Sequence, residues 1–252
     1  MLSFNDLKDW QSFRSTGTND STWGFVPTMG ALHRGHLSLV KRSIQENDRT
    51  VVSIFLNPTQ FNEPKDLSGY PQTLANDITM LEKAGIDVLL LPNFSQIYPD
   101  NYRYKLTESD FSLKLCGASR PGHFDGVLTV VMKLLNIVQA RHAYFGEKDY
   151  QQYLLIKEMA VAFFLPTNII ACPTVREVNG LAFSSRNARL TSDEHALAPR
   201  FYEILSQNIP VEACRTELMS SGFKLDYVEE LDDRRFGAVY LGKVRLIDNV
   251  PI

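Results

Sequence analysis

Two histidines three residues apart, His33 and His36, stand in the segment FVPTMGALHRGH at residues 25–36. They follow a run of strand-forming residues and a glycine turn, and Gly35 lies between them. A helix that begins near Gly35 offers free backbone N–H groups and a dipole that favour an anion. Imidazoles at this spacing face the same side of a helix, and glycine lets a base or ribose lie against the backbone. The segment therefore predicts a loop that binds the phosphates of ATP.

Two better-known kinds of site do not fit this segment. The pattern GALHRGHL has the glycine spacing of a P-loop, but His-Leu stands where Lys-Ser or Lys-Thr is required. The histidines also lack the H-E-x-x-H spacing of a zinc site, and no further cluster of histidines and cysteines supplies ligands. Histidines that only cap and pack a helix are the structural alternative.

The composition is that of an ordinary globular protein, with 252 residues, 44% apolar and 22% charged. A net charge of -3 argues against nucleic acid as the main partner. Cys116, Cys172 and Cys214 form no C-x-x-C pair, which indicates a reducing cytoplasm rather than a disulfide framework. The N-terminal sequence MLSFNDLKDW does not resemble a signal peptide, and no window has the roughly 18 apolar residues of a membrane span, so no membrane partner is expected.

Strand and helix patterns alternate through the first two-thirds of the chain. Short apolar runs typical of strands occupy residues 24–29, 50–57, 86–92, 143–147 and 167–172. Helical patterns occupy 73–85, 126–140 and 150–164, and Leu37, Val40 and Ile44 indicate one more helix between the first two strands. This alternation predicts an α/β fold, with a parallel sheet covered by helices on both faces.

The pattern changes near residue 188. Charged helices lead there into two expected strands, at 224–231 and 238–249. We therefore expect a catalytic domain over 1–187 and a small C-terminal α+β lid domain over 188–252.

Ligands of open parallel sheets bind beyond the carboxyl ends of the strands. Four loops should meet at that edge, at 27–36, 57–64, 146–152 and 173–187. Their polar residues that suit phosphates or a small acid are Asn57, Gln60, Lys148, Asp149, Gln152, Ser184, Ser185 and Arg186. Arg120 and His123 stand before a further helix. Each of these could be a solvated loop residue, but together they predict one site.

The tetrapeptide HRGH is similar to the H-x-G-H signature of nucleotidyl-transferring Rossmann-like enzymes. With NPTQF, RPGHF, GEKDYQQ and SSRN, the chain resembles the pantoate–β-alanine ligase family. The resemblance runs from VPTMGALHRGH through SSRNARL and resumes weakly in YVE and RLIDN. It implies a Rossmann-like domain in which pantoate attacks the α-phosphorus of Mg-ATP, and the amine of β-alanine then attacks the pantoyl adenylate. It further implies a cytoplasmic homodimer that holds no tightly bound organic cofactor.

The resemblance also assigns roles to residues. The catalytic residues it implies are His33, His36, Lys148 and Arg186, with His36 as a proton donor. The implied ATP-binding residues are Met29, Gly30, Ala31, Leu32, His33, Arg34, Gly35, His36, Gly146, Glu147, Lys148, Asp149, Val175, Phe183, Ser184, Ser185 and Arg186. Pantoate and β-alanine would contact Gln60, Gln152, Met29 and Asn57, and Asp77 would help to hold Mg²⁺. Phe55, Val127, Val130 and Val131 could form an apolar wall for the dimethyl group of pantoate, although helix core is an equal alternative for the valines.

Several features depart from the family pattern or leave alternatives open. Cys116 stands where many relatives carry Glu, Phe183 replaces a Met, and the C-terminal region is short. Residues 58–70, with two prolines and a glycine, are typical of a mobile flap. The alternatives are another H-x-G-H adenylyltransferase of the superfamily and a nucleotide-binding protein without turnover.

Overall fold

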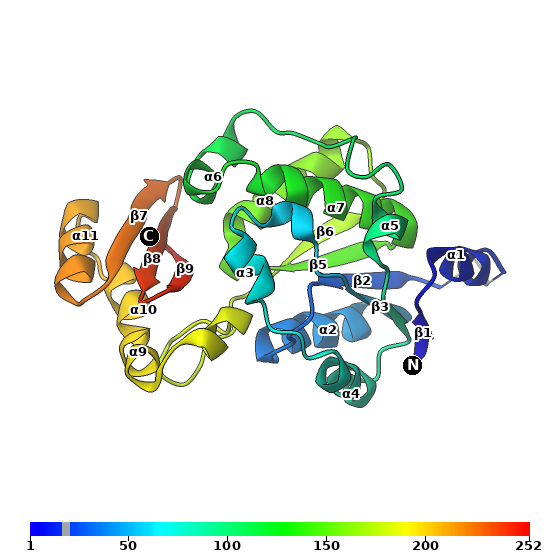
Figure 1. Ribbon diagram of the computed structural model, residues 1–252, viewed down its shortest axis with the longest axis horizontal. Helices are drawn as coiled ribbons and strands as arrows, with labels where there is room; N and C mark the ends of the chain where they lie inside the picture. Colours follow the sequence, from blue (N-terminus) through cyan, green and yellow to red (C-terminus); the bar gives the residue numbers. More distant parts are fainter. Residues whose placement is uncertain (17–20) are drawn as a thin grey trace.

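The computed structural model describes residues 1–16 and 21–252. It contains a six-stranded parallel sheet flanked by helices and a separate three-stranded antiparallel sheet near the C-terminus (Figure 1). Among these described residues, no helix is both long and apolar enough to cross a membrane.

The order of strands in the large sheet is β1-β4-β3-β2-β5-β6, and every pair is parallel. The strands are β1 (Leu2–Phe4), β2 (Trp23–Thr28), β3 (Arg49–Ile54), β4 (Val88–Leu90), β5 (His142–Gly146) and β6 (Asn168–Cys172). The chain proceeds from β2 to β3 on one side, and returns to the other side of β2 with β5. The direction of strand addition therefore reverses between β2 and β5, which is where ligands of such sheets bind.

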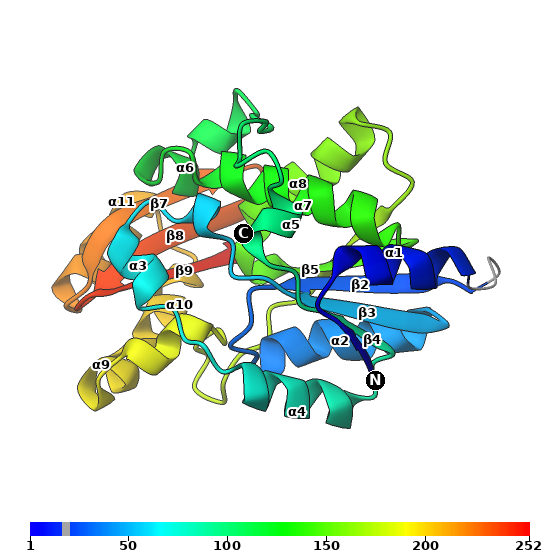
Figure 2. The ribbon, with the colours of Figure 1, turned by 45° about the vertical axis from the view of Figure 1, so that its right-hand side comes forward.

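Helices cover both faces of this sheet (Figures 1 and 2). One face packs against α2 (Arg34–Glu46) and α4 (Leu74–Ala84). The other face packs against α1 (Leu7–Thr16), α5 (Phe94–Ile97), α7 (His123–Val138) and α8 (Tyr150–Ala162). The α/β prediction is confirmed, including each of the five strands and four helices that the sequence indicated in this region.

The inward face of α2 includes a polar residue. The buried residues of α2 are Leu39, Val40 and Ser43, whereas Ile44 is 36% exposed. The Ser43 hydroxyl lies 2.8 Å from the hydroxyl of Thr50 on β3. The apolar spacing therefore indicates the helix but does not reveal that Ser43 lies on its inner face.

The C-terminal part has three strands instead of the two that were predicted. It comprises α9 (Ser192–Leu197), α10 (Pro199–Leu205), α11 (Val211–Ser220), β7 (Lys224–Leu231), β8 (Arg234–Leu241) and β9 (Val244–Pro251). The expected strand at 238–249 spans the end of β8 and most of β9, joined by a tight turn at Gly242, which has φ +56°. The region has its own core, which Leu181 joins from before the predicted boundary at 187.

Short helical turns complete the edge of the large sheet. They are η1 (Pro58–Gln60), α3 (Pro64–Ser68), η2 (Phe111–Leu113), α6 (Cys116–Ser119), η3 (Glu147–Asp149) and η4 (Ser185–Arg189). In Figure 1, α3 lies between the two sheets.

Candidate active site

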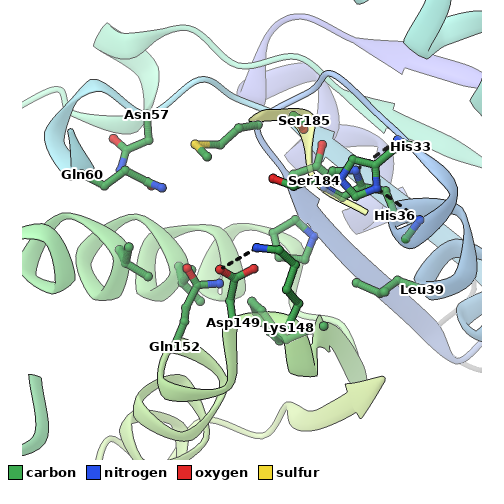
Figure 3. A pocket seen from close by; sticks show the side chains of 18 of the residues that line it. His33, His36, Leu39, Asn57, Gln60, Lys148, Asp149, Gln152, Ser184 and Ser185 are labelled. Carbon is green, nitrogen blue, oxygen red and sulfur yellow. Dashed lines mark hydrogen bonds and ion pairs between the residues drawn. The ribbon is translucent and has the colours of Figure 1, made fainter. Parts of the chain in front are cut away.

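A cavity of about 230 Å³ opens beyond the carboxyl ends of β2 and β5 (Figure 3). The predicted site residues that line it are Met29, His33, Gly35, His36, Asn57, Gln60, Gly146, Lys148, Asp149, Gln152, Val175, Phe183, Ser184, Ser185 and Arg186. Those that do not line it are Gly30, Ala31, Leu32, Arg34, Glu147 and Asp77. The four predicted loops thus meet at one edge of the sheet.

The two imidazoles take part in the N-terminal cap of α2. The backbone N–H of Gly35 donates to Nδ1 of His33 (3.2 Å), and the backbone N–H of His33 donates to Nδ1 of His36 (3.3 Å). A Cβ on Gly35 would lie 3.0 Å from the His33 ring, so glycine leaves room for that ring to fold back. Since both Nδ1 atoms accept, each neutral ring carries its proton on Nε2. The pair therefore offers two Nε2–H donors without a positive charge.

The surroundings keep these rings neutral. Burial, the neighbouring His36 imidazole and the positive charge of Lys148 lower the pKa of His33 to about 3. Burial and Lys148 lower the pKa of His36 to about 4. The Phe183 ring stacks at 6.2 Å from the His33 ring and covers it from the side of η4. At neutral pH both groups are thus hydrogen-bond donors and not cations.

These pKa values imply a pH dependence of stability. His123 behaves like His33 and His36, because burial and the charge of Arg120 lower its pKa to about 3. In the unfolded chain each imidazole has a pKa of about 6.5. As the pH falls below 6.5, the unfolded state takes up protons that the folded state does not, so the free energy of unfolding should fall steadily toward pH 4.

Urea unfolding at a series of pH values would measure this effect. The slope of the free energy of unfolding against pH should correspond to more than one proton taken up on unfolding. A free energy of unfolding that stays constant from pH 7 to pH 5 would contradict the neutral, buried state of the three rings.

Asp77 is a structural anchor in this geometry. Its side chain is buried at 1% exposure, and its two carboxylate oxygens accept the backbone N–H groups of Ala31 (2.9 Å) and Leu32 (2.8 Å). The Thr73 hydroxyl also donates to it (3.1 Å). Ala31 has φ +50°, a conformation that favours glycine, so these bonds hold a strained turn in place. These hydrogen bonds give Asp77 a structural role, and its role as a Mg²⁺ ligand stays a prediction.

The Asp77→Asn variant separates the two roles. Asparagine offers one accepting oxygen and places its NH₂ group against a backbone N–H. The free energy of unfolding should therefore fall by about 2 kcal/mol, equally with and without MgCl₂. Denaturant unfolding under both conditions measures this. A variant of unchanged stability whose activity returned at high MgCl₂ would restore the metal role.

The C-terminal sheet holds the loop that carries Lys148. The Asn249 side chain on β9 donates to the backbone carbonyls of Glu147 (2.8 Å) and Lys148 (3.0 Å). Nζ of Lys148 lies 3.9 Å from a carboxylate oxygen of Asp149, and both side chains line the cavity (Figure 3). Asn249 lies next to Asp248, which forms a two-pronged ion pair with Arg176. Both parts of the protein therefore contribute to the position of Lys148.

A second set of contacts fixes Gln60. Nδ2 of Asn57 donates to Oε1 of Gln60 (3.0 Å) and to the carbonyl of Gly126 (3.2 Å). This leaves the Nε2 group of Gln60 as the free donor, and Figure 3 shows it directed toward the cavity. A Cβ on Gly126 would lie 2.4 Å from the carbonyl oxygen of Thr59, so η1 can approach α7 this closely only over a glycine.

Arg120 and His123 support Gln60 from behind. His123 Nδ1–H donates to the backbone carbonyl of Gln60 (2.8 Å). Arg120 donates to His123 Nε2 (3.0 Å) and to the same backbone carbonyl (3.3 Å). Burial and the nearby positive charges of Arg186 and Arg245 lower the pKa of Arg120 to about 10. The sequence singled out Arg120 and His123, but gave them no role.

The cavity wall beside Gln60 is apolar. It consists of Phe55, Val127, Val130, Val131 and Leu134. The three valines belong to the core as well as to the cavity wall, so the helix-core alternative is confirmed and their contact with pantoate stays a prediction. The cavity thus joins a wall suited to a branched alkyl group with amides suited to hydroxyl and carboxylate groups.

The serine–arginine turn closes the other side. Ser185 donates to the carbonyl of Ala31 (2.9 Å), and the Ser184 side chain accepts the backbone N–H of Arg186 (3.3 Å). Burial would lower the pKa of Arg186, but its bond to Asp66 and the charge of Asp66 outweigh burial and raise it. Arg186 therefore remains a cation at the cavity wall.

Sequence reasoning missed several residues of the wall. They are Pro27, Thr28, Leu39, Phe61, Leu134, Tyr144, Phe145, Pro173 and Thr174. Tyr70 also lines the wall, and its side chain is buried at 6% exposure. Thr28 and Phe145 lie at the ends of β2 and β5, so their place beside the point where strand order reverses was the one signal available.

Comparison with known proteins gives consistent results. The family model described as pantoate-beta-alanine ligase matches residues 2–251. The pantothenate synthetase of Coxiella burnetii is 54% identical over 245 residues, which cover 97% of this chain and 95% of the relative. That of Bdellovibrio bacteriovorus is 53% identical and covers 100% and 98%. The C-terminal region is therefore not short compared with these relatives, contrary to the prediction.

Solved structures agree with the fold. A crystal structure of pantoate-beta-alanine ligase from Francisella tularensis, complexed with beta-gamma ATP and beta-alanine, has a TM-score of 0.96 and 47% identity. It covers 100% of this chain and 97% of that one. Pantothenate synthetase from Thermus thermophilus has a TM-score of 0.91 and 36% identity, and covers 100% and 99%.

Proposed function

The chain belongs to the pantoate–β-alanine ligase family, and on that premise we propose that it condenses pantoate with β-alanine through a pantoyl adenylate. ATP is consumed, and AMP and pyrophosphate are released. The single observation that supports this reaction most is the composition of the cavity. Neutral and cationic donors for phosphates lie on one side, and an amide beside an apolar wall lies on the other.

Adenylation is the step that these groups serve first. A carboxylate is a poor acyl donor until one of its oxygens is bonded to phosphorus. In this step a pantoate oxygen bonds to the α-phosphorus as the bond to pyrophosphate breaks, and no protein nucleophile is needed. Alignment of the two anions can contribute about 7–11 kcal/mol to lowering the barrier. Lys148 and Arg186, with the Nε2–H groups of His33 and His36, stabilise the negative charge that grows on the departing pyrophosphate.

Gln60 and Gln152 hold the acid substrate. Both line the cavity near the apolar wall, and their neutral amides bond hydroxyl and carboxylate oxygens without forming an ion pair. Asn57 fixes the orientation of the Gln60 amide, so the acid meets a donor of fixed direction. In the second step the amine of β-alanine attacks the acyl carbon, AMP leaves, and the amine loses a proton.

The phosphate-binding role of the loop rests on its geometry. Gly35 lies at the cavity wall, while Gly30, Ala31, Leu32 and Arg34 support the turn from outside the cavity. Gly146, Met29, Val175, Phe183 and the serine pair complete the proposed nucleotide contacts. Glu147 contributes through its backbone, which Asn249 holds.

We include Mg²⁺ in the proposal as the counter-ion of ATP. Among residues 1–16 and 21–252, no three side chains of the types His, Cys, Asp and Glu form a group suited to a metal ion, and Asp77 has both oxygens occupied. The ion would therefore be held mainly by the phosphates, as is common for Mg²⁺. Family membership supports the homodimer and the cytoplasmic location.

Exchange of labelled pyrophosphate into ATP tests the function. With β-alanine absent, exchange should require pantoate, because only the first step is reversed. Exchange with a different acid would favour another H-x-G-H adenylyltransferase. ATP binding without exchange for any acid would favour a nucleotide-binding protein without turnover.

A further inference from the structure

The carboxylate of Asp66 joins α3 to the serine–arginine turn. Its Oδ2 lies 2.8 Å from Nη2 of Arg186, and its Oδ1 lies 2.8 Å from Nη1 of Arg189. The three side chains are between 25% and 29% exposed. Ion pairs of charged groups that are largely withdrawn from water are worth more than pairs on an open surface. Asp66 therefore fixes two arginines of η4 that lie more than 100 residues away along the chain.

The two arginines differ in what they face. Arg186 lines the cavity, and Arg189 does not. Nη2 of Arg186 is engaged by Asp66, but a guanidinium has five N–H donors, so others remain for an anion in the cavity. The Arg186 guanidinium also lies 5.8 Å from the centre of the Tyr70 ring, which belongs to the segment after α3. Contacts from Asp66 in α3 and from Tyr70 just after it thus define the direction of the Arg186 side chain.

The charges of this cluster do not cancel. One carboxylate faces two guanidinium groups, which leaves one positive charge in excess. Burial would raise the pKa of Asp66, but its bonds to Arg186 and Arg189 outweigh burial and lower it. One carboxylate oxygen of Asp66 pairs with Arg189 and the other with Arg186. Asp66 therefore holds Arg186 without cancelling its positive charge. The excess charge lies on the side of the cavity where phosphates are proposed to bind.

We propose that Asp66 is a positioning residue for nucleotide binding, which holds the Arg186 guanidinium against the cavity and fastens α3 beside it. Arg189 is the second anchor, and it lets Asp66 hold Arg186 without cancelling its charge. This inference rests on the proposed function for the identity of the anion, a nucleoside triphosphate. It assigns Asp66 no direct contact with the substrate.

The Asp66→Asn variant tests the proposal by its dissociation constant for ATP, measured by calorimetry on the full chain. The variant keeps the shape of the side chain and loses its charge. Affinity for ATP should fall about tenfold, because a charge-assisted bond that orients Arg186 is lost. In an Arg186→Gln background, the added Asp66→Asn change should have no further effect, since Asp66 acts through Arg186.

Glu63→Gln is the matched control, because it removes a carboxylate that is exposed beside α3, makes no ion pair among the described residues and does not line the cavity. Its affinity for ATP should stay within about threefold of the unaltered protein. If the losses of ATP affinity caused by Asp66→Asn and by Arg186→Gln multiply in the double variant, the effect of Asp66 is merely structural. That result would overturn the proposal. Unchanged or tighter ATP binding by Asp66→Asn would overturn it too, because Asp66 would then be idle or would mask Arg186.

The outcomes for the two proposals are distinguishable. Suppose the unaltered protein binds ATP and the single and double variants at Asp66 and Arg186 behave as expected, but no pantoate-dependent exchange occurs. The proposed function then fails and the role of Asp66 stands. If exchange occurs and the cycle fails, only the role of Asp66 falls. An unaltered protein that binds no ATP would contradict both.

Discussion

Replacing Lys148 with alanine should lower the rate of adenylation by about 100- to 1,000-fold, the range found when one donor to a developing negative charge is removed. The side chain lines the cavity beside the two imidazoles, and its ion pair with Asp149 is long, at 3.9 Å. Its backbone is held separately by Asn249, so the loop should stay in place. Pantoate-dependent pyrophosphate exchange measures the rate, and thermal unfolding checks the fold.

Lys157→Ala provides the control for Lys148→Ala. Lys157 is exposed on α8, the helix that follows the Lys148 turn, and it does not line the cavity. Its loss should leave exchange within about twofold. If Lys148→Ala exchanged pyrophosphate at the rate of the Lys157→Ala variant, Lys148 would have no part in the reaction.

Replacing His36 with asparagine should lower the adenylation rate by about 100-fold with little loss of stability. The asparagine oxygen can take the place of Nδ1 and accept the His33 N–H, which preserves the cap of α2. The Nε2–H donor is missing, so one bond to the departing phosphates is lost. Exchange assays at saturating ATP, with thermal unfolding beside them, measure the two effects.

The His36→Gln variant is the matched partner, because the longer amide can place its NH₂ group near the original Nε2. We expect it to regain about tenfold of the rate that His36→Asn loses. Equal rates for the two variants would show that the position of the donor is irrelevant. A large loss of stability in both would show that His36 serves the helix cap alone.

Much of the large sheet could be predicted because its strands are buried on both sides. Such strands read as continuous apolar runs, as Val51 and Val52 on β3 and Leu89 and Leu90 on β4 do. The strand β1 gave no such signal, since it has three residues and none is buried. It joins the sheet through its backbone pairing with β4, which a pattern of side chains does not reveal.

The C-terminal sheet shows how a turn is missed. Gly242 and Lys243 separate β8 from β9, but apolar residues on both sides make one uninterrupted pattern. A Gly at the first position of a two-residue turn is a hairpin signal. Reading that signal before the apolar pattern would have divided the run correctly.

The candidate site was predictable where its functional residues lie close together in one loop of the sequence. His33, His36, Lys148 and Gln60 lie in the segments that follow β2, β3 and β5, and strand order brings them together. Contacts across the chain were not predictable. The pairing of Asp66 with Arg186 joins segments 120 residues apart, and the two N–H groups that donate to the Asp77 carboxylate belong to the backbone, which sequence patterns do not show.

The central claim is that the paired imidazoles at the start of α2 bind the nucleotide through their Nε2–H groups. A crystal structure with a non-hydrolysable ATP analogue tests it most directly. Phosphate oxygens should lie within about 3.2 Å of Nε2 of both His33 and His36, while both Nδ1 atoms keep their backbone donors. Phosphates bound away from these two rings, or rings turned so that Nδ1 faces the nucleotide, would contradict it.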